Sequence, residues 1–133
     1  MNASPGSEAS RAPRLVGRLM LAEAATFAIA SILHFGVAES FIDAAIPEAI
    51  IAVVLAGGAV RVLRRPTGSW WFALVTSLFA LVGVIIGLSV ILGGIVSRPV
   101  DVAYHATIFV ALVATVGMLL TPAVRRVLQR SST

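Results

Sequence analysis

Four long apolar stretches, separated by short polar connections, constrain this chain more than any other feature of its sequence. They cover approximately residues 15–36, 44–63, 70–95 and 102–120. An α-helix rises about 1.5 Å per residue, so about 20 apolar residues cross a hydrocarbon core about 30 Å thick. Each stretch is close to this length, and the third exceeds it, which predicts tilt or extension past the bilayer. The sequence therefore predicts four transmembrane helices.

The composition favours a lipid environment. Hydrophobic residues make up 59% of the 133 residues and charged residues only 12%, and the mean hydropathy is +1.01. A soluble domain carries about a quarter charged residues. A small domain also leaves much of its surface in water, where such an apolar surplus is costly. The lipid bilayer is therefore the predicted partner of this chain.

The arginines predict the orientation of the spans. All ten basic residues are arginine, and only Arg98 falls on the side of the membrane where Glu39, Asp43 and Asp101 lie. The other nine form three clusters, namely Arg11, Arg14 and Arg18; Arg61, Arg64 and Arg65; and Arg125, Arg126 and Arg130. Basic residues concentrate on the cytoplasmic side of membrane proteins, which predicts that both termini are cytoplasmic. Trp70 and Trp71, where the third span begins, fit interfacial anchors.

Short connections force sequential helices to run antiparallel. The predicted fold class is therefore all-α, an integral membrane up-down-up-down four-helix bundle. We expect a disordered cytoplasmic tail over residues 1–13, a transmembrane domain over 14–121 and a basic cytoplasmic tail over 122–133. Arginine-only basicity and abundant Ala, Val and Gly fit a GC-rich bacterial genome, which favours a bacterial plasma (inner) membrane. A competing hypothesis is a signal peptide cleaved after Ala28-Ile29-Ala30, which would leave three spans.

Small residues on two spans predict close helix packing. Gly83 and Gly87 form a GxxxG pattern in the third span, and Ala52 and Ala56 form a similar pair in the second. Such pairs let helix backbones approach closely, within one chain or between two copies. We favour packing within the chain.

Several chemistries are excluded by residue content. The chain has no cysteine, which excludes disulfides, thiolate metal sites and cysteine nucleophiles. It has no lysine, which excludes Schiff-base catalysis. No P-loop, GxSxG or HExxH motif is present. No basic segment interleaved with aromatic residues predicts binding to nucleic acid.

Glu23 is the ionisable residue predicted to lie deepest in the membrane, about 12 Å into the first span. An unpaired carboxylate at this depth would take up a proton, because hydrocarbon disfavours the charged form. One hypothesis is a proton- or cation-handling group that faces the bundle interior. The other is a protonated side chain that locks helix packing through a hydroxyl, for which Thr26, Ser77 and Ser89 are candidates.

A second polar group is predicted near the outer boundary. His34 ends the first span, Glu48 begins the second and His105 begins the fourth, so all three lie at similar depth. Asp101 precedes His105 by one turn and could orient its ring. Two imidazoles and a carboxylate suit a divalent metal such as zinc, iron or copper, and two imidazoles could ligate haem b.

Helix capping is an alternative explanation for this group. Asp43 and Asp101 could cap the second and fourth helices, and Glu48 near a helix N-terminus is favoured by the helix dipole. Pro47 fits the first turn of the second helix. His34 also shares a helix face with Glu23, within about 20°. This stripe could line a proton or ligand path, or form the buried face of the helix.

The chain resembles the DoxX-like group of small bacterial four-span membrane proteins. The resemblance rests on an arginine leading the first helix (Arg14 or Arg18) and on the run Glu48-Ala49-Ile50-Ile51-Ala52-Val53-Val54-Leu55-Ala56-Gly57-Gly58. A short arginine-containing turn, Arg64-Arg65-Pro66-Thr67-Gly68, then precedes the third span. The glycine–lysine signature of the group's first span is absent, and His34-Phe35-Gly36 stands in its place. Membership would imply a membrane protein sometimes tied to redox metabolism.

Three functional hypotheses follow. The preferred one is an accessory or small-ligand-binding protein with a polar pocket near the outer face, formed by His34, Glu48 and His105. An alternative is a redox enzyme or subunit that binds haem b or a metal at the same residues. A third is a proton-coupled transporter or channel that acts as an oligomer around Glu23. The expected protein partners are further copies of the chain or a membrane complex.

Overall fold

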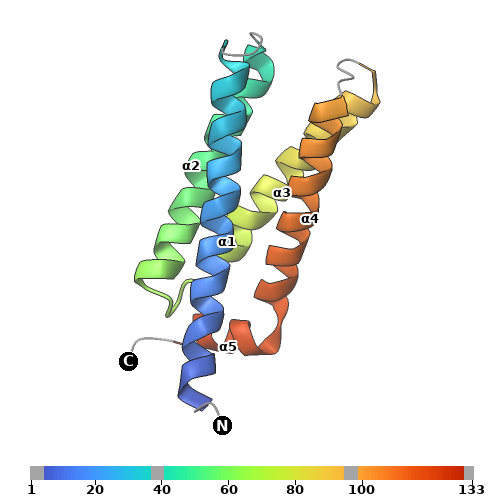
Figure 1. Cartoon of the computed structure of the whole chain (residues 1–133). Helices are drawn as coiled ribbons and strands as arrows, with labels where there is room; N and C mark the ends of the chain where they lie inside the picture. Colours follow the sequence, from blue (N-terminus) through green and yellow to red (C-terminus); the bar gives the residue numbers. More distant parts are fainter. Residues whose placement is uncertain (1–4, 37–40, 95–98, 131–133) are drawn as a thin grey trace.

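The computed structural model describes residues 5–36, 41–94 and 99–130 of the chain, with side chains placed from Arg11 onward. It contains five helices (Figure 1), which are α1 (Pro5–His34), α2 (Ile42–Arg64), α3 (Trp70–Leu92), α4 (Pro99–Leu120) and α5 (Pro122–Gln129). The first four are long and apolar enough to cross a membrane, over Arg11–His34, Ile42–Arg64, Trp70–Leu92 and Pro99–Leu120. The predicted all-helical class and the four candidate spans are confirmed.

The four long helices form a ring in which each packs on its neighbours in the chain and α1 also packs on α4. The pair α1 and α2 and the pair α3 and α4 make the most extensive contacts. Both described termini lie at the same end of the bundle (Figure 1). This is the arrangement expected when short connections join successive antiparallel helices.

Helical residues extend into both segments expected to be tails. Helix α1 begins at Pro5, inside the expected tail over residues 1–13, and the disorder of that tail stays a prediction. Proline suits the first position of a helix, where no N–H is needed. The predicted basic tail over 122–133 contains α5, which buries Val124 and Leu128 and turns its arginines outward. Residues 1–4 and 131–133 lie outside the described part of the chain.

The two polar residues expected to cap helices lie inside them. Helix α2 begins at Ile42 and α4 begins at Pro99, so Asp43 and Asp101 belong to first turns rather than to N-caps. Pro47 accordingly sits beyond the first turn of α2. Carboxylates in a first turn still benefit from the positive end of the helix dipole. Asp43 and Asp101 are therefore not N-caps, and that part of the explanation is wrong. The helix dipole still favours their carboxylates in the first turns.

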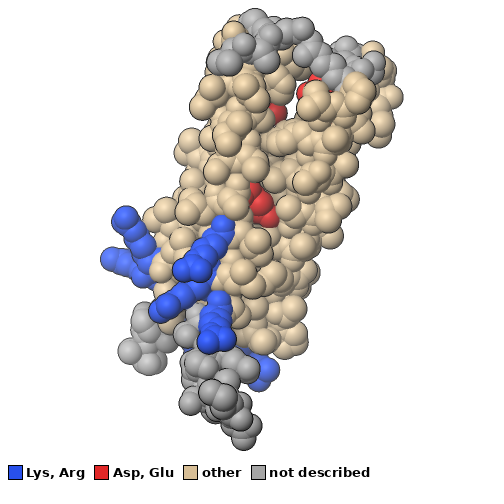
Figure 2. Space-filling view, viewed as in Figure 1, with Lys and Arg blue, Asp and Glu red and all other residues tan. Residues whose placement is uncertain are grey.

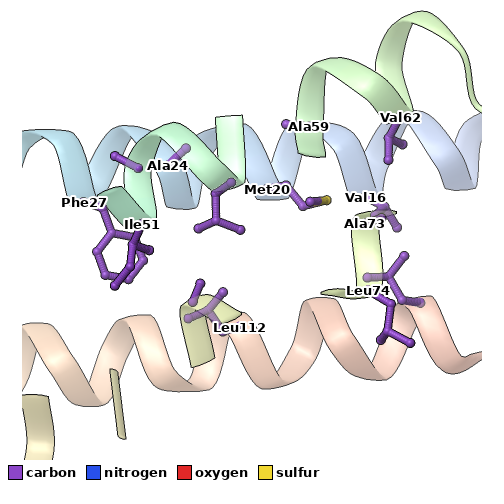
Figure 3. Close-up of a cluster of buried hydrophobic side chains, with 14 of the residues drawn as sticks. Val16, Met20, Ala24, Phe27, Ile51, Ala59, Val62, Ala73, Leu74 and Leu112 are labelled. Carbon is purple, nitrogen blue, oxygen red and sulfur yellow. The ribbon is translucent and has the colours of Figure 1, made fainter. Parts of the chain in front are cut away.

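The core runs along the axis of the bundle and is made of medium-sized apolar side chains. Figure 3 shows residues of all four long helices meeting there, with Met20 and Phe27 from α1 and Leu112 from α4. Ser31 ties α1 to α2, because its hydroxyl donates to the Ala45 carbonyl oxygen at 2.8 Å. Close packing of this kind holds helices together when lipid surrounds them and the hydrophobic effect between helices is weak.

The glycines of α3 pack within the chain, as expected. A Cβ atom at Gly83 would lie 2.5 Å from the Ile51 Cδ1 atom of α2, and one at Gly87 would lie 2.6 Å from the His105 Nε2 atom of α4. The GxxxG pattern therefore seats α3 between its two neighbours. Gly87 in particular provides the space into which a candidate functional residue fits.

Candidate functional site

A pocket of about 320 Å³ opens between the four long helices at the end of the bundle away from the arginines. Helix α1 contributes Phe27 and His34, and α4 contributes Asp101 and His105. The second and third helices supply the remaining walls, through Phe41, Asp43, Ala44, Pro47, Glu48, Ile51, Gly83, Val84, Ile86, Gly87, Val90 and Ile91. We name this cavity the outer pocket. Most of its wall is apolar, and its polar groups are confined to α1, α2 and α4.

His34 and Glu48 are joined directly across α1 and α2. The His34 Nδ1 atom lies 2.7 Å from the Glu48 Oε2 atom. Glu48 is buried and the His34 side chain is about a quarter exposed (23%). With Glu48 ionised, its carboxylate can only accept, and Nδ1 then carries the proton of this bond. In its neutral form His34 then has its lone pair on Nε2.

His105 is held by the backbone of its own helix. Its Nδ1 atom lies 2.9 Å from the Asp101 carbonyl oxygen, which can only accept, so Nδ1 carries the proton. The expected contact with the Asp101 side chain is not formed, and the ring is held by the Asp101 main chain instead. The Nε2 side of the ring lies against Gly87 of α3. Two imidazoles thus line the outer pocket with their Nδ1 atoms already engaged.

Aromatic rings surround the two histidines. The His34 ring meets Phe41 edge-to-face at 6.2 Å between centroids. Tyr104 meets the His105 ring at 5.1 Å and the Phe27 ring at 6.4 Å, also edge-to-face. Such contacts fix ring orientation and add about 0.5–1.5 kcal/mol per aromatic pair. The polar side chains of the pocket are therefore held in place by packing as well as by hydrogen bonds.

The charge of the pocket wall is negative. Three carboxylates line it, those of Asp43, Glu48 and Asp101, and no arginine is among its described lining residues. Figure 2 shows acidic side chains along the seam of the bundle and arginines gathered at the opposite end. Glu39 and Arg98, which the sequence places near this end, lie outside the described residues. Among the described residues, the carboxylates of the pocket and the arginines therefore lie toward opposite ends of the bundle.

The outer pocket brings the predicted ligands together without assembling a metal centre. His34, Glu48, His105 and Asp101 all line it. Within the described residues, no three His, Asp or Glu side chains are placed to hold one metal ion. The structure brings the four residues to one cavity, and binding of a ligand, haem b or a metal at them stays a prediction.

Glu23 forms a separate polar contact deeper in the bundle. It is buried, and its Oε1 atom accepts a hydrogen bond of 2.7 Å from the Thr115 hydroxyl of α4. The expected partners Thr26 and Ser89 donate instead to carbonyl oxygens of their own helices. The third candidate is Ser77, whose hydroxyl has no hydrogen-bond partner in the described part of the chain. The Glu23 Oε2 atom has none there either. This contact joins α1 to α4 and is distinct from the outer pocket.

Sequence reasoning missed two polar members of these sites. Thr115 was not among the predicted partners because threonine is common in apolar helices, although it lies near the end of α4 that packs beside Glu23. Asp43 was interpreted only as a cap, yet its place in the first turn of α2 brings it to the pocket wall. The sequence feature that could have identified these residues is their depth along the predicted spans, since polar residues at similar depth in neighbouring helices can meet.

The described residues define a small helical bundle with a partly polar cavity at the end away from the described arginines. Comparison of the chain with protein-family models, curated proteins and solved structures finds no match. The function is therefore inferred from the outer pocket and from the distribution of charge.

Proposed function

We propose that this chain is a multi-pass protein of the bacterial plasma membrane that binds a small amphipathic ligand in the outer pocket. The observation that carries the proposal is the pocket itself, which all four spans enclose with apolar walls and a few converging polar groups. Ligand sites typically combine these two features. In this proposal both termini are cytoplasmic and the outer pocket faces the opposite side of the membrane.

The outer surface of the bundle supports the membrane placement. Large apolar side chains project from every long helix, for example Ile29, Val53, Leu92 and Val110. Soluble monomers rarely expose apolar patches larger than a few hundred Å². The resemblance to the DoxX-like group fits the same placement.

The proposed orientation predicts a labelling pattern. The chain lacks cysteine, so Thr67→Cys, between α2 and α3, and Val100→Cys, in the first turn of α4, each introduce one thiol. In intact cells a membrane-impermeant maleimide should label Val100→Cys and leave Thr67→Cys unlabelled until the cells are opened. The reverse pattern would contradict the orientation, and labelling of both sites in intact cells would contradict membrane insertion of this topology.

The size of the outer pocket suits a small molecule. Its volume of about 320 Å³ falls at the lower end of the range of about 300–1,000 Å³ for ligand sites. The apolar faces of α2 and α3 would contact the body of such a ligand. Its polar end would meet the histidines and carboxylates. We therefore expect a compact amphiphile rather than a lipid or a large cofactor in this cavity.

Photolabelling tests whether the outer pocket takes such a molecule. A diazirine derivative of octanol, irradiated with the protein in lipid nanodiscs, should attach to peptides that line the pocket. Ala44→Trp places an indole in the cavity, because Ala44 is half-buried in its wall. We expect this variant to lose at least about 90% of the pocket labelling, since a filled cavity has no room for the probe.

Gly57→Trp is the matched control for this variant. It adds the same side chain to the same helix, at a position where a new Cβ atom would meet nothing within 4 Å. Pocket labelling should survive in Gly57→Trp. Equal labelling of pocket peptides in Ala44→Trp and the parent protein would overturn the proposal, because attachment would then not depend on the cavity.

A further inference from the structure

We infer that the ligand of the outer pocket is an organic cation, an amine with an apolar body. This inference rests on the proposed function and names the chemical class of its ligand. Three properties of the described pocket lead to it, namely the charge of its wall, the hydrogen-bonding state of its histidines and the position of its aromatic rings.

The first property is an excess of negative charge. Asp43, Glu48 and Asp101 line the cavity, and His34 is the one side chain in ion-pair contact with any of them among the described residues. With neutral histidines the described wall therefore carries three carboxylates and no fixed positive charge. An anionic ligand would be repelled, and a neutral one would gain hydrogen bonds to the carboxylates but no attraction between opposite charges. A cation would be attracted, most strongly near the buried Glu48, where water screens charge less than at the exposed Asp43.

The second property is that the free polar atoms are acceptors. The Nδ1 atoms of His34 and His105 donate to Glu48 and to the Asp101 carbonyl oxygen respectively. In the neutral rings this leaves Nε2 as an acceptor in both cases, and the carboxylates can only accept. A ligand that satisfies these atoms must supply hydrogen-bond donors. An ammonium group supplies up to three and carries the complementary charge.

The third property is the presence of aromatic side chains beside this charge. Phe27 and Phe41 both line the pocket, at its α1 side and at the start of α2. A cation over the face of an aromatic ring is attracted to it, and more strongly when it is desolvated. The apolar residues of α3, including Val84 and Ile91, complete a surface for the body of the ligand. Charge, donors and apolar shape therefore point to the same class of molecule.

Three ligands of similar shape and different charge test the inference. Phenethylamine is cationic at neutral pH, phenethyl alcohol is neutral and phenylacetate is anionic. Each is added in competition with the diazirine derivative of octanol, with the protein in nanodiscs of zwitterionic lipid so that the bilayer attracts no ion by charge. Phenethylamine should displace the probe at a concentration at least about tenfold lower than the alcohol, and phenylacetate should be the weakest.

Variants then locate the effect. Glu48→Gln keeps an acceptor for the His34 Nδ1 atom and removes one charge, so it should weaken phenethylamine about tenfold more than it weakens the alcohol. Asp43→Asn should act in the same direction, while Asp43→Glu should preserve amine binding because the charge remains. If Glu48→Gln fails to fold, the ligand series on the parent protein and the Asp43 pair still decide the question.

The outcomes separate the inference from the proposed function. Equal potency of amine and alcohol, or a preference for phenylacetate, would overturn the cationic ligand and leave the pocket as a ligand site. Equal weakening of amine and alcohol by Glu48→Gln would also overturn it, since the carboxylate would then act on pocket structure alone. If pocket labelling by the probe were the same in Ala44→Trp and in the parent protein, the proposed function itself would be wrong.

Discussion

Replacing Trp70 with alanine is expected to lower the free energy of unfolding by about 3–5 kcal/mol, the range for removing a large aromatic side chain from a packed interior. The indole is 4% exposed, and its Nε1–H group donates to the Leu119 carbonyl oxygen at 2.8 Å. The Arg125 guanidinium of α5 also lies 4.9 Å from the ring centroid. One side chain therefore connects the start of α3 to the end of α4 and to α5.

Its neighbour Trp71 provides the matched control. Trp71 is 66% exposed, so Trp71→Ala removes a side chain of the same size that is not packed in the interior. We expect a loss below about 1 kcal/mol for this variant. Unfolding can be followed by far-ultraviolet circular dichroism during titration of mixed micelles with sodium dodecyl sulfate. Equal losses for the two variants would show that both tryptophans act at the interface and that the packing of Trp70 is unimportant.

A more conservative variant separates the hydrogen bond from the packing. Trp70→Phe keeps an aromatic ring but leaves the Leu119 carbonyl oxygen without its donor at the end of α4. We expect a smaller loss than for Trp70→Ala, because part of the ring contact remains. This comparison divides the contribution of one residue into shape and polar pairing.

The two tryptophans also show where sequence reasoning reached its limit. Both occur where the third span begins, and both were expected to be interfacial anchors. Position along the chain gives depth, which was sufficient to place them at one end of the bundle. It does not give rotation about the helix axis, and a step of one residue turns the side chain by about 100°. Trp70 consequently points inward and Trp71 outward.

The same distinction explains the outcome for the candidate site. The depth of His34, Glu48 and His105 followed from the span boundaries, and all three meet in the outer pocket as predicted. The hydrogen bonds that these side chains form could not be derived from the span boundaries. The partner of Glu23 is Thr115, a residue far away in sequence. Only packing of α1 on α4 decides which of several hydroxyls at similar depth faces the carboxylate.

Helix α5 was missed for a different reason. The segment Pro122–Gln129 is short and rich in arginine, so its average hydropathy resembles that of a solvated tail. Its signal was the spacing of Val124 and Leu128, four residues apart, which places both on one helix face. A pair of apolar residues is weak evidence in any sequence. The structure adds the buried surface against which that face packs.

Gly58 is the second position where a small change should have a large effect. A Cβ atom there would meet the Thr76 Oγ1 atom of α3 and would lie 2.7 Å from the Met20 Cε atom of α1. Gly58 lies on α2, so three helices converge on the space that glycine leaves empty. Gly58→Leu should therefore cost about 3 kcal/mol or more, the upper part of the range for overpacking, because neighbours on two helices must move at once.

The adjacent glycine makes this prediction specific to packing. Gly57 faces open space, with nothing within 4 Å of a new Cβ atom, and Gly57→Leu should be neutral or stabilise the helix by up to about 1 kcal/mol. Both variants replace glycine with leucine in the same turn, so they share the change in helix propensity. The same dodecyl sulfate titration measures both. If Gly58→Leu were as stable as Gly57→Leu, the close approach of α1, α2 and α3 at this level would be wrong. The ring of helices that encloses the outer pocket would then need a different packing.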